Sequence, residues 1–285
     1  MAQNNSSKLK LSELPIAIIG AGEIGRAVGS VLHQTGRQVA YWDKNPTSLS
    51  DLAETEVNTS LPDLIRTSGA VILAVPSWFA REALAFFGAY LSSQNTLAIL
   101  SKGLDPGSGR TIIELTQTLV TKKGVGVVVV GGPMIAEELS VGQVGFATLA
   151  SKQTKSSQAL AELFAGSRLR CELSNDYLGV AYAGVLKNVY ALGFGIGCGL
   201  GWGKNLQAYY LKRAGEEMTS LLPNLGGKKE TVWSVAGLAD LWATANSPDS
   251  LNRSNGEKIA QGLPTERRSE GEASLPLLIA SIKKP

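Results

Sequence analysis

Short apolar segments alternate with helical patterns through the first 174 residues, and this alternation limits the fold more than any other feature. The apolar segments are nearly continuous, which is typical of strands buried on both faces of a sheet. Such strands, separated by helices, predict a parallel sheet covered by helices on both sides. We expect strands at residues 16–20, 38–42, 70–75, 96–100, 125–130, 144–149 and 168–173, and helices at residues 23–34, 77–91, 109–121 and 154–165.

The character of the sequence changes after Ser174. Residues 177–222 read as long helices that are dense in glycine and alanine, and no convincing strand follows them. A chain of 285 residues is long enough for two domains with separate cores. We therefore expect an α/β domain with a parallel sheet over residues 15–174 and an all-α domain over residues 175–285, preceded by a disordered leader over residues 1–14.

Glycine occupies every second position from Gly193 to Gly203 within the expected helical region. Because glycine weakens a helix, these residues need a structural reason. Close approach of a ligand or of another helix is one reason, and an irregular, loop-like passage is the other. The sequence leaves both readings open.

A glycine-rich turn follows the first expected strand and opens the first expected helix. Residues 20–25 read GAGEIG, the G-x-G-x-x-G pattern of dinucleotide-binding folds. Its glycines allow a tight turn and let a pyrophosphate approach the backbone at a helix N-terminus. The residues expected to hold the cofactor here are Gly20, Gly22, Glu23, Ile24 and Gly25.

Asp43 stands at the end of the second expected strand, 18 residues after Gly25. An acid at this position binds the 2′-hydroxyl of the adenosine ribose and favours NAD. Lys44 follows directly and offers a contact for the 2′-phosphate of NADP. The pair leaves the choice between NAD and NADP open, with a preference for NAD.

Charge, cysteine content and hydropathy exclude several classes of protein. The 27 lysines and arginines are scattered and the net charge is +3, which argues against a nucleic-acid surface. Cys171 and Cys198 lie far apart without metal-like spacing, so we expect no metal site and no disulfide, which fits a reducing cytoplasm. The polar N-terminal segment does not resemble a secretory signal. The long uncharged run contains many glycines and a central lysine, so we expect no membrane span.

That central lysine, Lys187, is the only charged residue between Asp176 and Lys204. An unpaired buried ammonium is costly, so such a lysine has a carboxylate partner or a shifted pKa. A lysine with a lowered pKa can exchange protons near neutral pH. Asp240, an acid within an apolar stretch, is the candidate partner.

Lysine is also the remaining candidate for acid–base chemistry, because the only histidine, His33, lies late in the first expected helix. Lys102 directly follows the fourth expected strand. Ligands bind at the carboxyl ends of strands in open α/β sheets, so Lys102 is expected to face the cofactor crevice. Gly132 follows the fifth expected strand in the same way, and Ala136 begins the next segment.

Seven segments, taken in order, resemble the NAD(P)-dependent glycerol-3-phosphate dehydrogenases over roughly residues 15 to 262. They are GAGEIG, LAVPSWFAREAL, LSKGLDPGSGR, GGPMIAEEL, VLKNVYALGFGIGCGLGWGKN, GLADLWAT and SLNRSNG. The resemblance implies a Rossmann domain followed by a helical domain, usually in a homodimer. It also implies reversible hydride transfer between NAD(P)H and dihydroxyacetone phosphate, a small phosphorylated three-carbon substrate.

The same resemblance assigns roles to individual residues. Lys187 is implied to be the general acid/base on the C2 oxygen, Asp240 to orient and charge it, and Lys102 to hold the substrate beside the nicotinamide. The other positions that match substrate or cofactor contacts are Gly132, Ala136, Asn188, Thr244, Ser250, Asn252 and, in a Glu-Gly turn, Glu270.

The chain also departs from the family pattern. Where the family has Ser-Arg-Asn, this chain has Ser250-Leu251-Asn252. The resemblance implies that this arginine clamps both the phosphate and the cofactor, and leucine has no equivalent of a bidentate arginine contact. Arg253 is a candidate replacement, although on a helix it would point elsewhere. The segment after Glu270 is also short. These departures leave two alternatives open: a dehydrogenase of another small hydroxy acid, and a catalytically weak NAD(P)-binding sensor.

Overall fold

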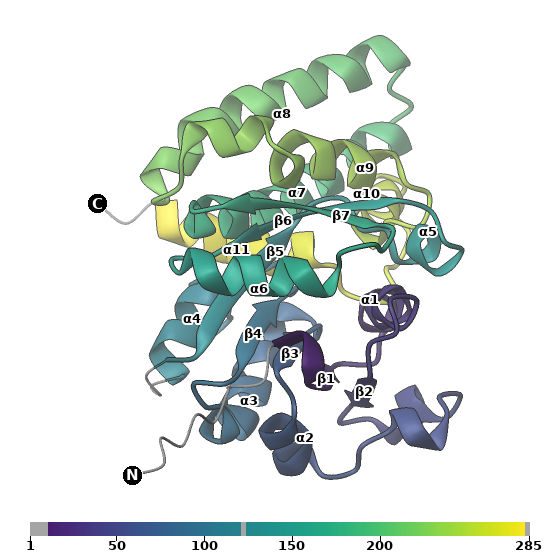
Figure 1. Ribbon diagram of the computed structural model, residues 1–285. Helices are drawn as coiled ribbons and strands as arrows, with labels where there is room; N and C mark the ends of the chain where they lie inside the picture. The colour runs from purple at the N-terminus through teal and green to yellow at the C-terminus, as the bar shows by residue number, and fades with distance from the viewer. Residues whose placement is uncertain (1–10, 121–123, 283–285) are drawn as a thin grey trace, which may run out of the picture.

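The computed structural model describes residues 11–120 and 124–282 as an α/β domain followed by a helical domain (Figure 1). A seven-stranded sheet with the strand order β2-β1-β3-β4-β5-β6-β7 forms the first domain. This architecture confirms the predicted fold class. The strands are β1 Ile16–Ile19, β2 Val39–Trp42, β3 Ala70–Leu73, β4 Thr96–Ile99, β5 Gly126–Gly131, β6 Gly145–Ala150 and β7 Leu169–Ser174.

The central strands β1, β3 and β4 are buried on both faces, and their alternate residues enter two different cores, whereas the edge strand β7 is largely exposed or half-buried. In β1, Ile16 and Ile18 belong to one core and Ala17 and Ile19 to the other. The first core includes residues of α1 and α6, and the second includes residues of α2, α3 and α4. The helices of this domain are α1 Glu23–His33, α2 Leu61–Thr67, α3 Ser77–Phe87, α4 Ile112–Leu119, α5 Ala136–Ser140 and α6 Thr154–Leu163.

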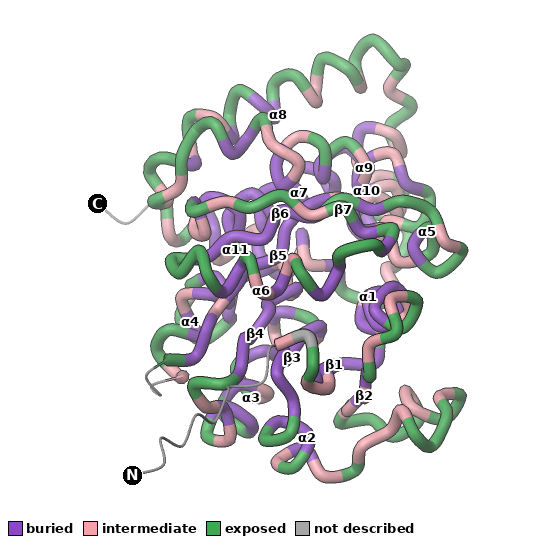
Figure 2. The backbone as a smooth tube through the Cα atoms, in the orientation of Figure 1, coloured by how far each residue is buried: buried purple, intermediate pink, exposed green. Residues whose placement is uncertain are grey.

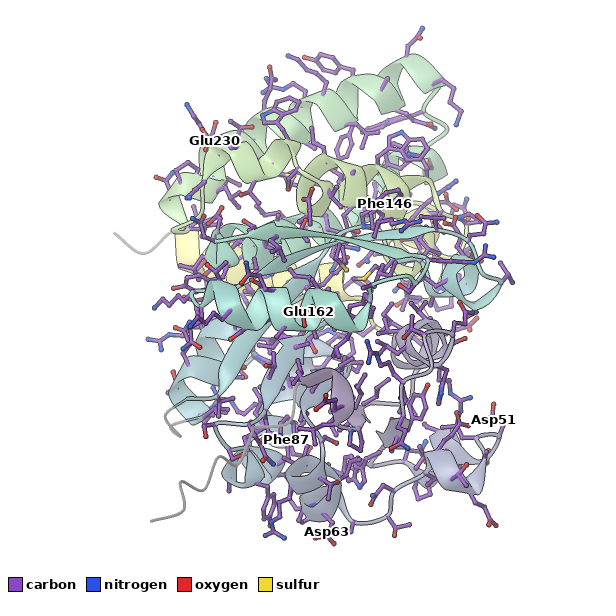
Figure 3. All side chains as sticks on the ribbon, in the orientation of Figure 1. Asp51, Asp63, Phe87, Phe146, Glu162 and Glu230 are labelled. Carbon is purple, nitrogen blue, oxygen red and sulfur yellow. The ribbon has the colours of Figure 1, made fainter. Side chains whose placement is uncertain are left out.

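Burial follows this layering. The tube in Figure 2 is purple through β3 and β4, whose residues are all buried. Phe87, at the end of α3, is fully buried in the second core, whereas Asp51 and Asp63 are exposed (Figure 3). The apolar pattern of the sequence therefore maps onto the two cores as expected.

Strand β6 departs from the expected parallel sheet, because it pairs with β5 in antiparallel fashion. The connection between them, residues 132–144, contains only the five-residue helix α5. A parallel return usually carries a full helix across the sheet, and α5 is too short for that. The short connection instead turns the chain back beside β5, and Phe146 N donates a hydrogen bond to Pro133 O.

The helical domain is built around the long helix α7, which continues without interruption through the lone lysine of the uncharged run. A third core, separate from the two sheet cores, surrounds this helix. Figure 1 shows α8 lying across the outer side of α7. The helices are α7 Tyr177–Gly199, α8 Lys204–Asn224, α9 Asp240–Asn246, α10 Leu251–Ala260 and α11 Glu270–Ile282, with the short turns η5 Lys229–Trp233 and η6 Val235–Ala239 between α8 and α9.

Both readings left open by the sequence hold in part: the glycines within α7 permit close approach of other segments, whereas Gly201, with a φ of +79°, and Gly203 lie in the irregular turn between α7 and α8. A Cβ atom on Gly195 would lie 2.1 Å from the backbone oxygen of Arg253 in α10. A Cβ atom on Gly256, on the facing side of α10, would lie 2.2 Å from the backbone oxygen of Leu192. The two helices therefore pack backbone to backbone, and this packing sets the position of α10 relative to Lys187.

The leader expected over residues 1–14 lies mostly outside the described residues. Within the described part, Leu11–Glu13 form the short turn η1, and Leu11 packs against the first core. The remaining short turns are η2 Pro46–Leu49, η3 Glu54–Glu56 and η4 Gly88–Tyr90. Among residues 11–120 and 124–282, no helix combines the length and the apolar character that crossing a membrane requires.

Candidate active site

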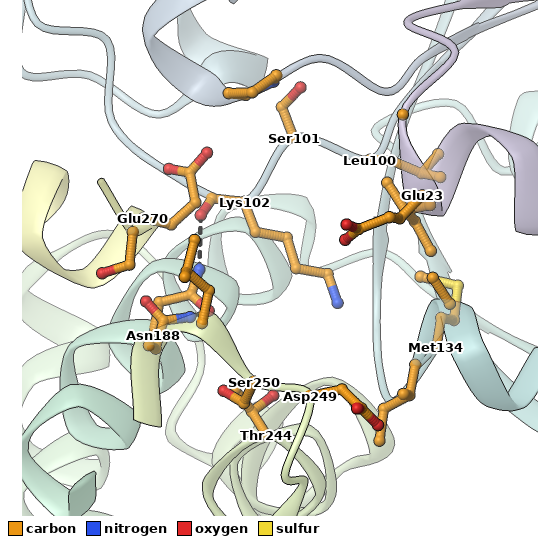
Figure 4. Close-up of a pocket in the computed structure, with 18 of the residues that line it drawn as sticks. Glu23, Leu100, Ser101, Lys102, Met134, Asn188, Thr244, Asp249, Ser250 and Glu270 are labelled. Atoms are coloured by element: carbon orange, nitrogen blue, oxygen red, sulfur yellow. Dashed lines mark hydrogen bonds between the residues drawn. The ribbon is translucent and has the colours of Figure 1, made fainter. Parts of the chain in front are cut away.

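A cavity of about 740 Å³ lies where the carboxyl ends of the central strands meet the helical domain. One wall comes from residues that follow β1, β3, β4 and β5, and the other from α7, α9, α10 and the loop before α11. Figure 4 shows Glu23 and Met134 on one side and Lys102, Asn188 and Glu270 on the other. This is the position at which open α/β sheets bind ligands.

The glycine-rich turn has the shape needed to hold a pyrophosphate. Gly20 has a φ of +103°, a conformation that glycine adopts without strain. A Cβ atom on Gly25 would lie 2.1 Å from Gly20 O, so only glycine allows helix α1 to start this close to the turn. Gly22 lines the cavity, has no heavy atom within 4 Å of an added Cβ, and caps α1 without any side chain. The first amides of α1 are thus free to face an anion, and the turn fits a dinucleotide cofactor.

The two residues expected at the adenosine end differ in their surroundings. Asp43 accepts hydrogen bonds from Ala21 N at 2.8 Å and from Asn45 N at 2.8 Å, so its carboxylate is fixed against the glycine-rich turn. Lys44 is exposed, and its Nζ atom lies 2.6 Å from Glu82 Oε1. Asp43 is therefore pre-positioned next to the turn, whereas Lys44 is engaged with a neighbouring acid.

Three charged groups meet at the centre of the cavity. Asp240 Oδ2 accepts from Lys102 Nζ at 2.7 Å and from Gly132 N at 3.1 Å. Asp240 Oδ1 lies 3.3 Å from Lys187 Nζ, which also donates to Thr244 Oγ1 at 2.8 Å. Asp240 therefore bridges the loop after β4, the turn after β5 and helix α7.

Burial controls the electrostatics of this cluster, because the side chains of Asp240 and Lys187 are only 3% and 10% exposed. Loss of hydration lowers the pKa of Lys187 from 10.5 to about 8; the charge of Asp240 opposes this shift and that of Lys102 adds to it. For Asp240, burial favours the protonated form, but the two ammonium groups outweigh it and hold the pKa below its usual value. The cluster carries two cations and one anion, so it attracts anionic ligands.

A second network joins α7 to α10 and to the start of α11. Asn188 Nδ2 donates to Lys102 O at 2.8 Å, and Asn252 Nδ2 donates to Asn188 Oδ1 at 3.0 Å. Gly271 N completes the chain by donating to Asn252 Oδ1 at 2.8 Å. A Cβ atom on Gly271 would lie 2.5 Å from Asn188 O, so glycine is required for this contact. Both asparagines are thereby fixed at the cavity wall.

Glu270 contacts a residue that sequence reasoning missed. Its carboxylate accepts from Ser77 N at 2.7 Å and from Ser77 Oγ at 2.6 Å, at the N-terminus of α3. Burial raises the pKa of Glu270, while the two bonds from Ser77 work against that rise. The available signal for Ser77 was its place, four residues after the carboxyl end of β3. The cavity wall also includes Arg267 and Arg268, which carried no sequence signal.

The structure separates the residues at the start of α10. Ser250 caps the helix by accepting from Arg253 N at 3.3 Å, and Leu251 lines the cavity. The Arg253 guanidinium donates to Glu257 Oε1 at 2.9 Å and to Asn246 O at 3.0 Å, and it is not part of the cavity wall. Ala136 lines the cavity, and Gly132 meets the cluster through its backbone. Among the residues described, no group of three or more histidine, cysteine or acidic side chains gathers as a metal site would require.

Comparison with known proteins points to a single family. Residues 15–157 match the N-terminal domain, and residues 176–276 the C-terminal domain, of NAD-dependent glycerol-3-phosphate dehydrogenase. A glycerol-3-phosphate dehydrogenase [NAD(P)+] from Thioalkalivibrio sulfidiphilus is 33% identical over 88% of this chain and 80% of its own length. One from a Synechococcus species is 34% identical over 90% and 80%, respectively.

Solved structures agree with these matches. The crystal structure of glycerol-3-phosphate dehydrogenase from Coxiella burnetii superposes with a TM-score of 0.87 at 28% identity, covering 95% of this chain and 89% of that one. The enzyme from Dunaliella salina, at 20% identity and a TM-score of 0.76, shares the fold over 94% of this chain and 55% of its own.

Replacing Asp240 with asparagine tests whether the charged cluster is mutually stabilised. Asp240→Asn leaves two ammonium groups at a buried site without their carboxylate, so we expect a loss of about 3 kcal/mol in the free energy of unfolding, measured by urea denaturation. Asp249→Asn, the same change at an exposed acid on the cavity wall, should stay within about 0.5 kcal/mol of the wild type. Equal stability of the two variants would show that Asp240 does not stabilise the two lysines.

Proposed function

Because this chain belongs to the family of NAD-dependent glycerol-3-phosphate dehydrogenases, we propose that it reversibly reduces dihydroxyacetone phosphate to sn-glycerol 3-phosphate. It is an oxidoreductase that uses NAD or NADP. One observation carries the proposal: a buried lysine with a lowered pKa shares one cavity with the glycine-rich turn. This arrangement supports a role for Lys187 in exchanging a proton beside the bound cofactor.

In this proposal Lys187 supplies or removes the proton on the C2 oxygen of the substrate. The bound nicotinamide cofactor supplies or accepts the hydride on carbon. A pKa of about 8 leaves Lys187 with both protonation states populated near neutral pH, as a reversible acid–base catalyst requires. Asp240 and Thr244 hold its Nζ atom in place from two directions, which leaves the remaining N–H of the ammonium for the substrate.

The substrate phosphate is the second element of the proposal. Lys102 and Lys187 carry two positive charges against the one negative charge of Asp240, so this cluster favours an anion. The N-terminus of α10 opens on the same cavity through Ser250, Leu251 and Asn252, and backbone amides at a helix start are favourable partners for phosphate. Asn188 and Gly132 are the remaining proposed substrate contacts.

We further propose that NAD(H) is the preferred cofactor. The Asp43 carboxylate, fixed by Ala21 N, can accept the 2′-hydroxyl of the adenosine ribose and would repel a 2′-phosphate. Lys44, the residue that could compensate, is paired with Glu82. Ala136 and Glu270, both on the cavity wall, are proposed as further cofactor contacts. The family resemblance supports a homodimer. The two free cysteines fit a reducing cytoplasm.

One observation favours a second candidate function. Leu251 lines the cavity where the family pattern has arginine, and the Arg253 guanidinium is bound elsewhere. Without that phosphate contact, the chain would suit a dehydrogenase of another small hydroxy acid. A preference for or against a phosphate group on the substrate distinguishes the two functions.

The first test is oxidation of NADH at 340 nm with dihydroxyacetone phosphate, dihydroxyacetone and a panel of small 2-oxo acids, with NADPH in parallel. We expect turnover on the order of 1 s⁻¹ or more with the phosphorylated ketone, and a lower KM for NADH than for NADPH. Faster turnover of an unphosphorylated substrate would establish the second candidate. NADH binding without any turnover would indicate a sensor.

Lys187→Ala tests the assigned acid–base role. We expect kcat to fall by about a thousandfold, with NADH affinity unchanged, because the side chain serves the substrate oxygen rather than the cofactor. Lys212→Ala, which removes an exposed lysine of α8, should behave as wild type.

The pH dependence of wild-type turnover is an independent test of the acid–base role of Lys187. Reduction needs protonated Lys187, so kcat/KM should fall as the pH rises through about 8, and in the oxidation direction it should rise over the same interval. Retained turnover in Lys187→Ala, or profiles without a transition near pH 8, would contradict the role.

A further inference from the structure

The cavity has an arginine-bearing wall that the family pattern does not account for. Arg267 and Arg268 line it from the loop that precedes α11, while Leu251 lines it where the family has arginine. Both arginine side chains are exposed. The positive charge missing from α10 is therefore present on the neighbouring loop, at the mouth of the same cavity.

Arg267 faces the glycine-rich turn. Its Nη1 atom lies 3.6 Å from Oε1 of Glu23, the first residue of α1. A guanidinium from the helical domain is thus held across the cavity mouth from the helix N-terminus that fits a pyrophosphate. The two side chains are 69% and 68% exposed, so this ion pair is weak and can be exchanged for a stronger one.

The backbone of this loop is fixed although the arginine side chains are not. Asn255 Nδ2, from α10, donates to Arg267 O at 2.8 Å and to Glu272 Oε2 at 2.6 Å. Ser269 is buried and bonds to the same Glu272 carboxylate through its N and Oγ atoms. The charge of the exposed Arg268 guanidinium acts on the carboxylates of Glu270 and Glu272. The fixed backbone reduces the entropy lost when the exposed guanidinium groups bind an anion.

We propose that Arg267, supported by the charge of Arg268, clamps the pyrophosphate of the bound dinucleotide against the N-terminus of α1, in place of the arginine that Leu251 replaces. The inference rests on the proposed function only in taking a dinucleotide as the cofactor. The pyrophosphate offers more acceptor oxygens and more negative charge than the Glu23 carboxylate, so it displaces Glu23 as the partner of Arg267. Arg267 would therefore recognise the diphosphate of the cofactor, and this contact does not depend on which substrate is reduced.

Equilibrium binding of NADH, followed by its fluorescence, measures the clamp without relying on turnover. We expect Arg267→Ala to raise the Kd about tenfold, which corresponds to about 1.4 kcal/mol, and Arg267→Lys to raise it by less. Arg268→Ala should have a smaller effect in the same direction. Arg213→Ala, which removes an exposed, ion-paired arginine of α8, is the matched control and should stay within about twofold of the wild type.

Competition with ADP and with adenosine separates a pyrophosphate contact from a general structural effect. Arg267→Ala should weaken displacement of NADH by ADP, and leave displacement by adenosine unchanged relative to the wild type. Equal weakening of both, or an NADH affinity of Arg267→Ala equal to that of Arg213→Ala, would overturn the proposal. So would an effect confined to the KM for dihydroxyacetone phosphate, because the clamp would then serve the substrate.

The outcome is independent of the proposed reaction. Wild-type protein that binds NADH but does not reduce dihydroxyacetone phosphate would refute the substrate, and the binding comparison would still decide the clamp. Wild-type protein that binds neither NADH nor NADPH would overturn both.

Discussion

The Asp240 carboxylate is the interaction on which the site depends. It contacts Lys102 from the loop after β4, Gly132 from the turn after β5 and Lys187 from α7, so one buried group connects the sheet to the helical domain. Burying three charges is unfavourable unless each is paired and hydrogen-bonded, and Thr244 and Gly132 provide the additional bonds. The same burial lowers the pKa of Lys187 into the range in which it can exchange protons.

Backbone packing between helices holds this cluster in register. Glycines at 195 and 256 let α7 and α10 approach closely, and Gly271 lets the start of α11 reach Asn188. The asparagines of α7 and α10 then bond to each other and to the backbone of Lys102. Residues far apart in sequence thereby form one rigid wall, so a ligand meets groups that are already oriented.

Features that depend on local pattern could be predicted from the sequence. The buried strands and the turn at residues 20–25 follow from apolar runs and glycine spacing, which are local properties. Pairing of Lys187 with Asp240 was a hypothesis based on the scarcity of charge around both residues, and the structure brings them to 3.3 Å.

Features that depend on tertiary contacts could not be predicted. The antiparallel placement of β6 follows a connection whose helix, α5, is too short to cross the sheet. The bond of Ser77 to Glu270 joins residues 193 positions apart, and the arrangement of Arg267 opposite Glu23 depends on how the two domains meet. Local pattern also could not show which of the alternating glycines pack against α10 and which form the turn after α7, because the partner helix lies some 60 residues away.

Burial makes Lys187 a group that titrates near neutral pH, although the Asp240 carboxylate opposes this shift. The most direct test is an NMR titration of protein labelled with ¹³C at the lysine Cε, in which the Lys187 signal is assigned by its absence from Lys187→Arg. We expect a pKa of about 8 for this signal, and a further decrease when Asp240 is replaced by asparagine, since the carboxylate favours the charged form. A Lys187 pKa near the ordinary 10.5 would contradict this expectation.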